Sequence, residues 1–169
     1  SGTSRPSSQS AGDVHGWAAW LDGDDHWTDP EKLVRQVEAL REHPEWAGCF
    51  HDATVRQVDG GAPDRAYVPE DLPGALGFTD LLRSNPVPSL SVMVRGEHVR
   101  NLPGWVFEGL WSDWLSLLAI ARHGQLGYLA ERMGVYRVHP AGISSGLPRA
   151  EQLLPQPVDL LVELLGRHV

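Results

Sequence analysis

Cysteine, lysine and long apolar runs are almost absent from this sequence, and each shortage excludes something. The single cysteine, Cys49, rules out an intrachain disulfide and is consistent with a reducing compartment. No apolar run approaches the roughly 18 residues of a membrane-spanning helix, and no charged-then-apolar leader is recognisable. We therefore expect no transmembrane segment and a cytoplasmic location, with peripheral attachment to a membrane as the alternative.

Positive charge is scarce as well. The sequence has 14 lysines and arginines against 22 aspartates and glutamates, its formal net charge is -8, and Lys32 is the only lysine. This balance argues against a protein whose main task is to bind nucleic acid or an anionic membrane. A protein of negative net charge can still bind a phosphate-bearing substrate if a metal cation mediates the contact.

The 169 residues fit one domain, and a hydrophobic content of 41% is enough to form a core. Serine, glycine and proline dominate the first residues without any periodicity. We therefore predict a disordered leader or the remnant of a truncation over residues 1–14, followed by one domain over residues 15–169.

Strand-like and helix-like segments alternate along that domain, which predicts an α/β class. The clearest helix follows Thr28, because Thr28 and Glu31 have the spacing of a capping box and Pro44 ends the apolar periodicity. Further helices are predicted over 78–85, from Ser112 or Asp113 to Gly124, and over 158–166. Strands are predicted over 17–21, from 47 to the turn at 60, and over 89–95, 126–130 and 135–139.

Three aspartates, Asp22, Asp24 and Asp25, directly follow the first predicted strand. Their like charges repel one another, and a divalent cation such as Mg²⁺ or Mn²⁺ relieves that repulsion. Ligands of open α/β sheets gather outside the carboxyl ends of the strands, so a D-x-D there can hold a metal that also binds a substrate diphosphate. The alternative is a structural role, because aspartates are common in turns.

Two other acidic motifs compete with this interpretation. An EF-hand loop starting at Asp22 needs glycine in its sixth place and glutamate in its twelfth, where the sequence has Trp27 and Leu33. A haloacid-dehalogenase-like phosphatase would use Asp22 as nucleophile and Asp24 as acid and base, but it also needs a later lysine. Lys32 is too close to supply it, so the phosphatase stays a weak alternative.

Four segments in succession resemble the second half of a family 2 glycosyltransferase with the GT-A fold. They are WLDGDDHWTDPEKLVRQVEAL, NPVPSLSVMVR, LPGWVFEGLWSDWLSLL and MGVYRVHPAGISS, which together span roughly residues 16–145. The resemblance implies an incomplete GT-A, Rossmann-like mixed sheet flanked by helices. It also implies transfer of a sugar from a nucleotide-diphosphate sugar to an acceptor hydroxyl of a glycan, lipid or protein, with a metal and with inversion.

The resemblance also implies roles for individual acidic residues. Asp24 and Asp25 would hold the Mg²⁺ or Mn²⁺ ion, with Asp25 as the more direct ligand, and Asp22 would face the donor's ribose or support the loop. Asp113 in the S-D-W segment would be the general base, and a plain helix cap is its alternative role. Glu108 is the reserve base and an acceptor-side residue.

Other residues take their expected roles from the same resemblance. His139 in the Y-R-x-H segment would contact the metal or the diphosphate, with a structural role as the alternative. Arg95 would neutralise donor phosphate unless it is a solvated strand end. Trp105 and Trp111 would stack on the faces of the acceptor sugar.

Members of that family carry a long N-terminal stretch that binds the nucleotide base and ribose, and nothing like it is found before the D-x-D segment. We therefore expect a missing N-terminal half, an open edge of the sheet and impaired activity of this chain alone. The main rival is a non-catalytic carbohydrate- or protein-binding module, in which the aspartates only shape turns.

Overall fold

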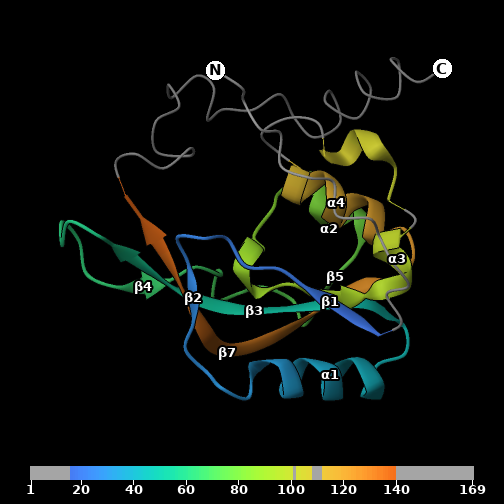
Figure 1. Ribbon diagram of the computed structural model, residues 1–169, viewed down its shortest axis with the longest axis horizontal. Helices are drawn as coiled ribbons and strands as arrows, with labels where there is room; N and C mark the ends of the chain where they lie inside the picture. Colours follow the sequence, from blue (N-terminus) through green and yellow to red (C-terminus); the bar gives the residue numbers. More distant parts are fainter. Residues whose placement is uncertain (1–15, 101, 108–111, 140–169) are drawn as a thin grey trace, which may run out of the picture.

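The computed structural model describes residues 16–100, 102–107 and 112–139 (Figure 1). The predicted leader and the helix predicted over 158–166 lie outside these ranges. The described part is a mixed α/β structure, which confirms the predicted class at that level. Within it, no helix has the length and the apolarity needed to cross a membrane.

In the described ranges the sheet has seven strands, in the order β1-β6-β3-β7-β2, with β4 paired to β3 and β5 paired to β7. The strands are β1 (Trp17–Ala19), β2 (His26–Trp27), β3 (Trp46–Gln57), β4 (Arg65–Ala66), β5 (Ala75–Leu76), β6 (Met93–Arg95) and β7 (Gln125–Val138). The helical segments are α1 (Lys32–Glu42), α2 (Phe78–Arg83), α3 (Gly96–Arg100) and α4 (Ser112–Ile120), with the 3-10 turns η1 (Ser89–Ser91) and η2 (Gly104–Phe107).

The long strands β3 and β7 run parallel through the middle of the sheet, whereas β1, β2 and β6 pair antiparallel with their neighbours. Register shifts on either side of Asp52 interrupt the β3–β7 ladder, and such irregularities let a sheet curl. The two strands predicted over 126–130 and 135–139 form the single strand β7, because its polar middle residues continue the pairing with β3.

Helix α1 lies on one side of the sheet, and α2 and α4 lie on the other (Figure 1). The predicted capping box of α1 is wrong: Thr28 still pairs with β7 through its backbone N–H to Met133, and the Oδ1 atom of Asp29 instead accepts the N–H of Glu31 at 2.8 Å. The helix ends at Glu42, two residues before Pro44, as predicted.

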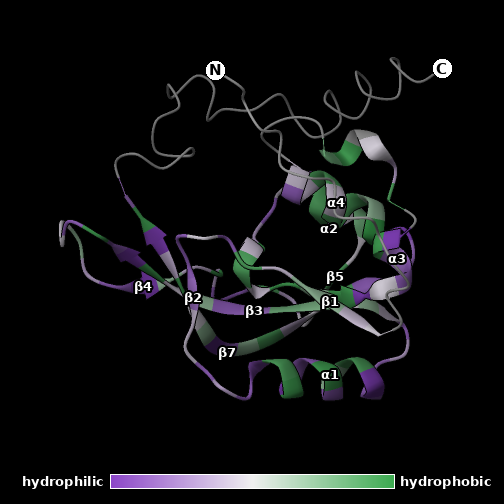
Figure 2. Ribbon diagram, viewed as in Figure 1, coloured by the Kyte–Doolittle hydropathy of each residue, from purple (hydrophilic) through white to green (hydrophobic). Residues whose placement is uncertain are grey.

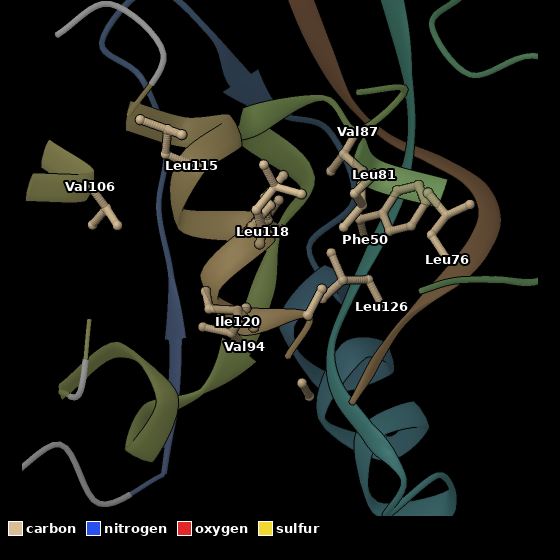
Figure 3. Close-up of a cluster of buried hydrophobic side chains, with 14 of the residues drawn as sticks. Phe50, Leu76, Leu81, Val87, Val94, Val106, Leu115, Leu118, Ile120 and Leu126 are labelled. Atoms are coloured by element: carbon tan, nitrogen blue, oxygen red, sulfur yellow. The ribbon is translucent and has the colours of Figure 1, made fainter. Parts of the chain in front are cut away.

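The main core fills the space between the sheet and helices α2 and α4. In Figure 3, the side chain of Leu118 from α4 points toward Phe50 of β3 and Leu126 of β7, while Ile120 lies beside Val94 of β6. Figure 2 shows α2 and α4 as largely hydrophobic ribbons, in agreement with this burial. The residues predicted to face inward from α4 are buried or half-buried, namely Trp114, Leu117, Leu118 and Ala121.

Gly124 directly precedes β7. Glycine is needed there because the chain is closely packed, and not because a helix ends in the left-handed conformation. A Cβ atom there would lie 2.4 Å from the carbonyl oxygen of Glu45 and 2.9 Å from the amide nitrogen of Ala47. Both contacts are to backbone at the start of β3, so a rotamer change cannot relieve them. The tight β3–β7 junction therefore requires glycine.

We expect Gly124→Ala to destabilise the fold by about 2 kcal/mol, because the added methyl group must push two strands apart. Urea denaturation measures this change. Gly74→Ala is the matched control, since a Cβ atom at Gly74 meets nothing within 4 Å. Equal stabilities of the two variants would contradict the close packing.

Candidate functional site

The loop that follows β1 folds back onto the far end of β7. Its turn is closed by the N–H of Asp25, which donates to the carbonyl of Asp22 at 3.2 Å, and β2 then pairs with β7 through His26 and Val135. We call residues 22–25 the aspartate loop. The antiparallel pairing carries this loop to residues that lie more than one hundred positions later in the sequence.

Two residues near the end of β7 contact the aspartate loop. The backbone N–H of Arg137 donates to Oδ1 of Asp25 at 2.9 Å, and the Arg137 guanidinium donates to the backbone carbonyl of Asp24. Nε2 of His139 lies 3.1 Å from Oδ2 of Asp24, with both side chains partly exposed. The structure therefore places Asp24 and Asp25 against the end of β7 and brings Asp24 into contact with His139, and all three residues were predicted from the sequence.

The charged form of Asp25 is unfavourable, because the side chain is buried next to two other aspartates. The side chain is 9% exposed, and burial raises its pKa above the usual value for an aspartate. The negative charges of Asp24 and Asp22 raise this pKa further, while the hydrogen bond from the Arg137 N–H opposes the shift. An approaching cation would stabilise the charged form of Asp25.

The 3-10 turn η1 supports the aspartate loop from the side. The hydroxyl of Ser89 donates to Oδ2 of Asp22 at 2.8 Å, and the indole N–H of Trp27 donates to the carbonyl of Leu90 at 2.8 Å. Asp22 therefore has a partner within the protein, which favours the loop-supporting alternative among its predicted roles. The strand predicted to start at Ser89 begins at Met93 instead.

Asp113 lies in the first turn of α4 and shares its electrostatic surroundings with the aspartate loop. Burial raises the pKa of Asp113, and the nearby charge of Asp22 adds to the shift. Tyr67, which follows β4, has its pKa raised to about 12 by burial first, then by Tyr136 and Asp113, with a smaller contribution from Asp25. These interactions with Asp113 and Asp25 make Tyr67 a further candidate residue, which the sequence interpretation missed.

The backbone of Tyr67 is held by a buried carboxylate in β3. Oδ1 of Asp52 accepts the backbone N–H groups of Ala53, Tyr67 and Val68 at 2.8, 3.1 and 2.9 Å. Its Oδ2 pairs with Nε of Arg132 at 2.9 Å. Asp52 thereby fixes the backbone of the segment that carries Tyr67.

Arg95 has a different role from the one predicted. Its guanidinium donates to the backbone carbonyls of Leu40, His43 and Trp46, at 2.6, 3.2 and 2.8 Å, and lies over the ring of Trp17. Arg95 pairs with Trp17, at the end of β1 away from the aspartate loop. Its charge therefore stabilises the C-terminus of α1, and the expected phosphate contact is corrected.

The predicted acceptor side falls largely beyond what the structure describes. Glu108 and Trp111 lie outside the described residues, and so does the side chain of Trp105 in η2. From the sequence, Arg137 was expected on the face opposite His139 and was given no role; this was wrong in its premise, because residues two apart in the strand predicted over 135–139 share a face.

Within the described ranges, no group of three or more His, Cys, Asp and Glu side chains is arranged to hold a metal ion. Asp24 of the aspartate loop and His139 are two such groups in contact, at 3.1 Å. Any cation placed there would need further ligands from elsewhere, such as substrate oxygens or water.

No protein-family model matches the sequence. The uncharacterized protein Rv1520 of Mycobacterium tuberculosis and the uncharacterized protein Mb1547 of Mycobacterium bovis are each 37% identical to it over 128 residues. The matched residues are 75% of this chain and 36% of each relative. The chain therefore spans about a third of the length of the curated relatives it matches.

Proposed function

We propose that this chain is part of a metal-dependent glycosyltransferase of the GT-A type, which transfers a sugar from a nucleotide-diphosphate sugar with inversion. The observation that carries the proposal is the contact of Asp24 with His139 at 3.1 Å. These residues belong to the D-x-D and Y-R-x-H segments, the two that the resemblance assigns to the metal and the diphosphate.

The residues of the aspartate loop fit a divalent cation that is shared with a substrate. Mg²⁺ and related ions are commonly held by one or two carboxylates together with substrate phosphates and water, rather than by a complete protein cage. No three of these side chains form a complete cage in the described residues, so Asp24, Asp25 and His139 would hold the ion only together with substrate oxygens. The imidazole favours Mn²⁺ over Mg²⁺. When bound, the cation neutralises negative charge on the departing diphosphate.

The remaining chemistry belongs to side chains of this chain. Asp113 would accept the proton of the acceptor hydroxyl, as its oxygen bonds to the anomeric carbon and the bond from that carbon to the diphosphate breaks. The raised pKa of Asp113 makes its carboxylate a stronger base. Tyr67 stays protonated at neutral pH and can donate a hydrogen bond to a bound sugar.

We also propose that donor binding requires chain beyond this one. The matched relatives are much longer than this chain, and β1 is the last strand on its side of the described sheet. A further strand added at β1 would extend the sheet next to the aspartate loop, where the resemblance places the nucleotide-binding half. The cytoplasmic location and the possible association with a membrane surface belong to this proposal too.

Isothermal titration with Mn²⁺ alone, and then with UDP in the presence of Mn²⁺, tests the proposal. We expect saturable Mn²⁺ binding at one site, and UDP binding with a dissociation constant of about 1 mM, because the base and ribose contacts are missing. Absence of Mn²⁺ binding would contradict the metal site. Micromolar UDP binding would contradict the requirement for further chain.

A non-catalytic binding module is the second candidate, and one observation favours it. Each of Asp22, Asp24 and Asp25 has a hydrogen-bonding partner within the protein, as expected of aspartates that shape a loop. The Mn²⁺ titration separates the two candidates, because such a module has no use for the ion.

The phosphatase alternative is less compatible with the structure. Its chemistry needs a lysine near the D-x-D carboxylates, and the amine of Lys32 is buried and hydrogen-bonded to Gln36 at 2.7 Å. Release of phosphate from p-nitrophenyl phosphate by this chain would restore that alternative.

A further inference from the structure

The only lysine of the chain is buried, and no carboxylate among the described residues forms an ion pair with it. Lys32, the first residue of α1, is 1% exposed, and its Nζ atom donates to Oε1 of Gln36 at 2.7 Å. The same amine lies 4.0 Å from the centre of the Trp27 ring. A cation is costly to bury, so a lysine in this place needs a reason beyond packing.

Gln36 extends the contact of Lys32 to two other elements. Its Nε2 atom donates to the carbonyl of Ser91 in η1 at 2.8 Å and to Sγ of Cys49 in β3 at 3.6 Å. Both Lys32 and Gln36 are buried between α1 and the sheet. The amine therefore orients the side chain that ties α1 to η1.

All three residues of η1 face this assembly or the aspartate loop. The hydroxyl of Ser89 donates to Asp22, and the carbonyl of Leu90 accepts the indole N–H of Trp27. The carbonyl of Ser91 accepts the side-chain N–H of Gln36. Trp27 comes two residues after Asp25 and belongs to β2, the strand that lays the aspartate loop on β7. Lys32 thus contacts Trp27 on one side and, on the other, Gln36, which is hydrogen-bonded to η1.

We propose that Lys32 is a positioning residue for the aspartate loop: its amine, held over Trp27 and bonded to Gln36, keeps β2 and η1 in the arrangement that presents Asp24 and Asp25. The positioning rests on these contacts alone. Its consequence for Mn²⁺ binding rests on the proposed function.

The protonation of this buried cluster supports the proposal. Burial lowers the pKa of Lys32 to about 8, whereas it raises the pKa of Cys49 to about 12 and lowers the pKa of His51 to about 4. These are the titratable groups of β3 that face Lys32, and Gln36 and Trp27 are neutral. Between pH 6.5 and 9.5, roughly, Lys32 is therefore the group of this cluster that changes charge.

Fluorine NMR of the protein labelled with 5-fluorotryptophan tests the positioning directly. Of the seven tryptophan signals, the one lost in Trp27→Phe belongs to Trp27. We expect this signal to titrate with a midpoint near pH 8, because loss of the proton removes the cation from the ring. The titration should vanish in Lys32→Met, which we expect to fold, because an apolar side chain of similar length replaces a buried cation.

Arg41→Met is the matched control, since it removes one cation from an exposed position of the same helix. Mn²⁺ affinity should fall about tenfold in Lys32→Met and stay unchanged in Arg41→Met. A Trp27 signal that ignores pH in the wild-type protein, or wild-type Mn²⁺ affinity in Lys32→Met, would overturn the positioning role. If the wild-type protein binds no Mn²⁺, the proposed function fails, and the Trp27 titration still decides the positioning.

Discussion

Replacing Asp25 with asparagine is expected to weaken Mn²⁺ binding by about 100-fold while leaving the fold intact. Loss of a charged ligand costs at least as much affinity as loss of a residue that merely supports a ligand. The asparagine side chain keeps an oxygen that can accept the N–H of Arg137, so the contact between the aspartate loop and β7 persists. Isothermal titration with Mn²⁺ measures the loss.

The same substitution should leave thermal stability unchanged or raise it. Because the folded state raises the pKa of Asp25, it holds the proton more tightly than the unfolded chain does. The stability contributed by this group is then lost as pH rises from the ordinary aspartate pKa through the raised one, so at neutral pH the charged side chain opposes folding. Asparagine removes that opposition.

Glu42→Gln is the control for Asp25→Asn. It removes the same charge at the exposed last residue of α1, roughly 15 Å along the helix from Lys32. We expect its Mn²⁺ affinity to match the wild-type protein. Full Mn²⁺ affinity in Asp25→Asn would show that Asp24 and His139 bind the ion without Asp25, against the predicted ligand role.

Replacing Asp52 with alanine is expected to have the largest effect on stability, a loss of about 3–5 kcal/mol. The backbone N–H groups of Ala53 and Val68 would lose their acceptor, and each buried donor left unpaired costs about 1–3 kcal/mol. The N–H of Tyr67 keeps a partner, because it also donates to the carbonyl of Ala53 at 2.9 Å. The Arg132 side chain is half exposed and can turn to water, so its loss of a partner adds little. Urea denaturation monitored by circular dichroism measures the change.

Asp64→Ala is the matched control for Asp52→Ala. Asp64 also pairs with an arginine, Arg56, at 2.6 Å, but both side chains are about half exposed. Exposed ion pairs contribute at most about 1 kcal/mol, so we expect this variant to be nearly as stable as the wild-type protein. A loss for Asp52→Ala no larger than for this control would contradict the role assigned to the buried carboxylate.

Much of the local structure follows from the sequence pattern. The apolar periodicity after Pro30 predicts α1, the alternation after Ala47 predicts β3, and the small apolar segment starting at Phe78 predicts α2. The position of Asp22, Asp24 and Asp25 directly after a predicted strand also indicated the aspartate loop as a candidate site. Each of these features depends on neighbours within a few residues, so a local pattern is enough to reveal it.

Contacts between distant segments were harder to foresee. The sequence alone could not show that Arg95 binds the end of α1, that Tyr67 interacts electrostatically with Asp113, or that Lys32 is buried. Each depends on which strands pair and in what register. A lysine on a predicted amphipathic helix is usually exposed, and only the position of Trp27 over the first turn of α1 places this one inside.

The sequence by itself determined the class of the fold, the strong acidic balance and the presence of three adjoining aspartates. Only the tertiary structure decided which residues meet these aspartates, because β2 must first lie antiparallel on β7 before Arg137 and His139 reach them. Residues near one another in the sequence determine local conformation, but the composition of the site depends on the pairing of strands that are more than one hundred residues apart.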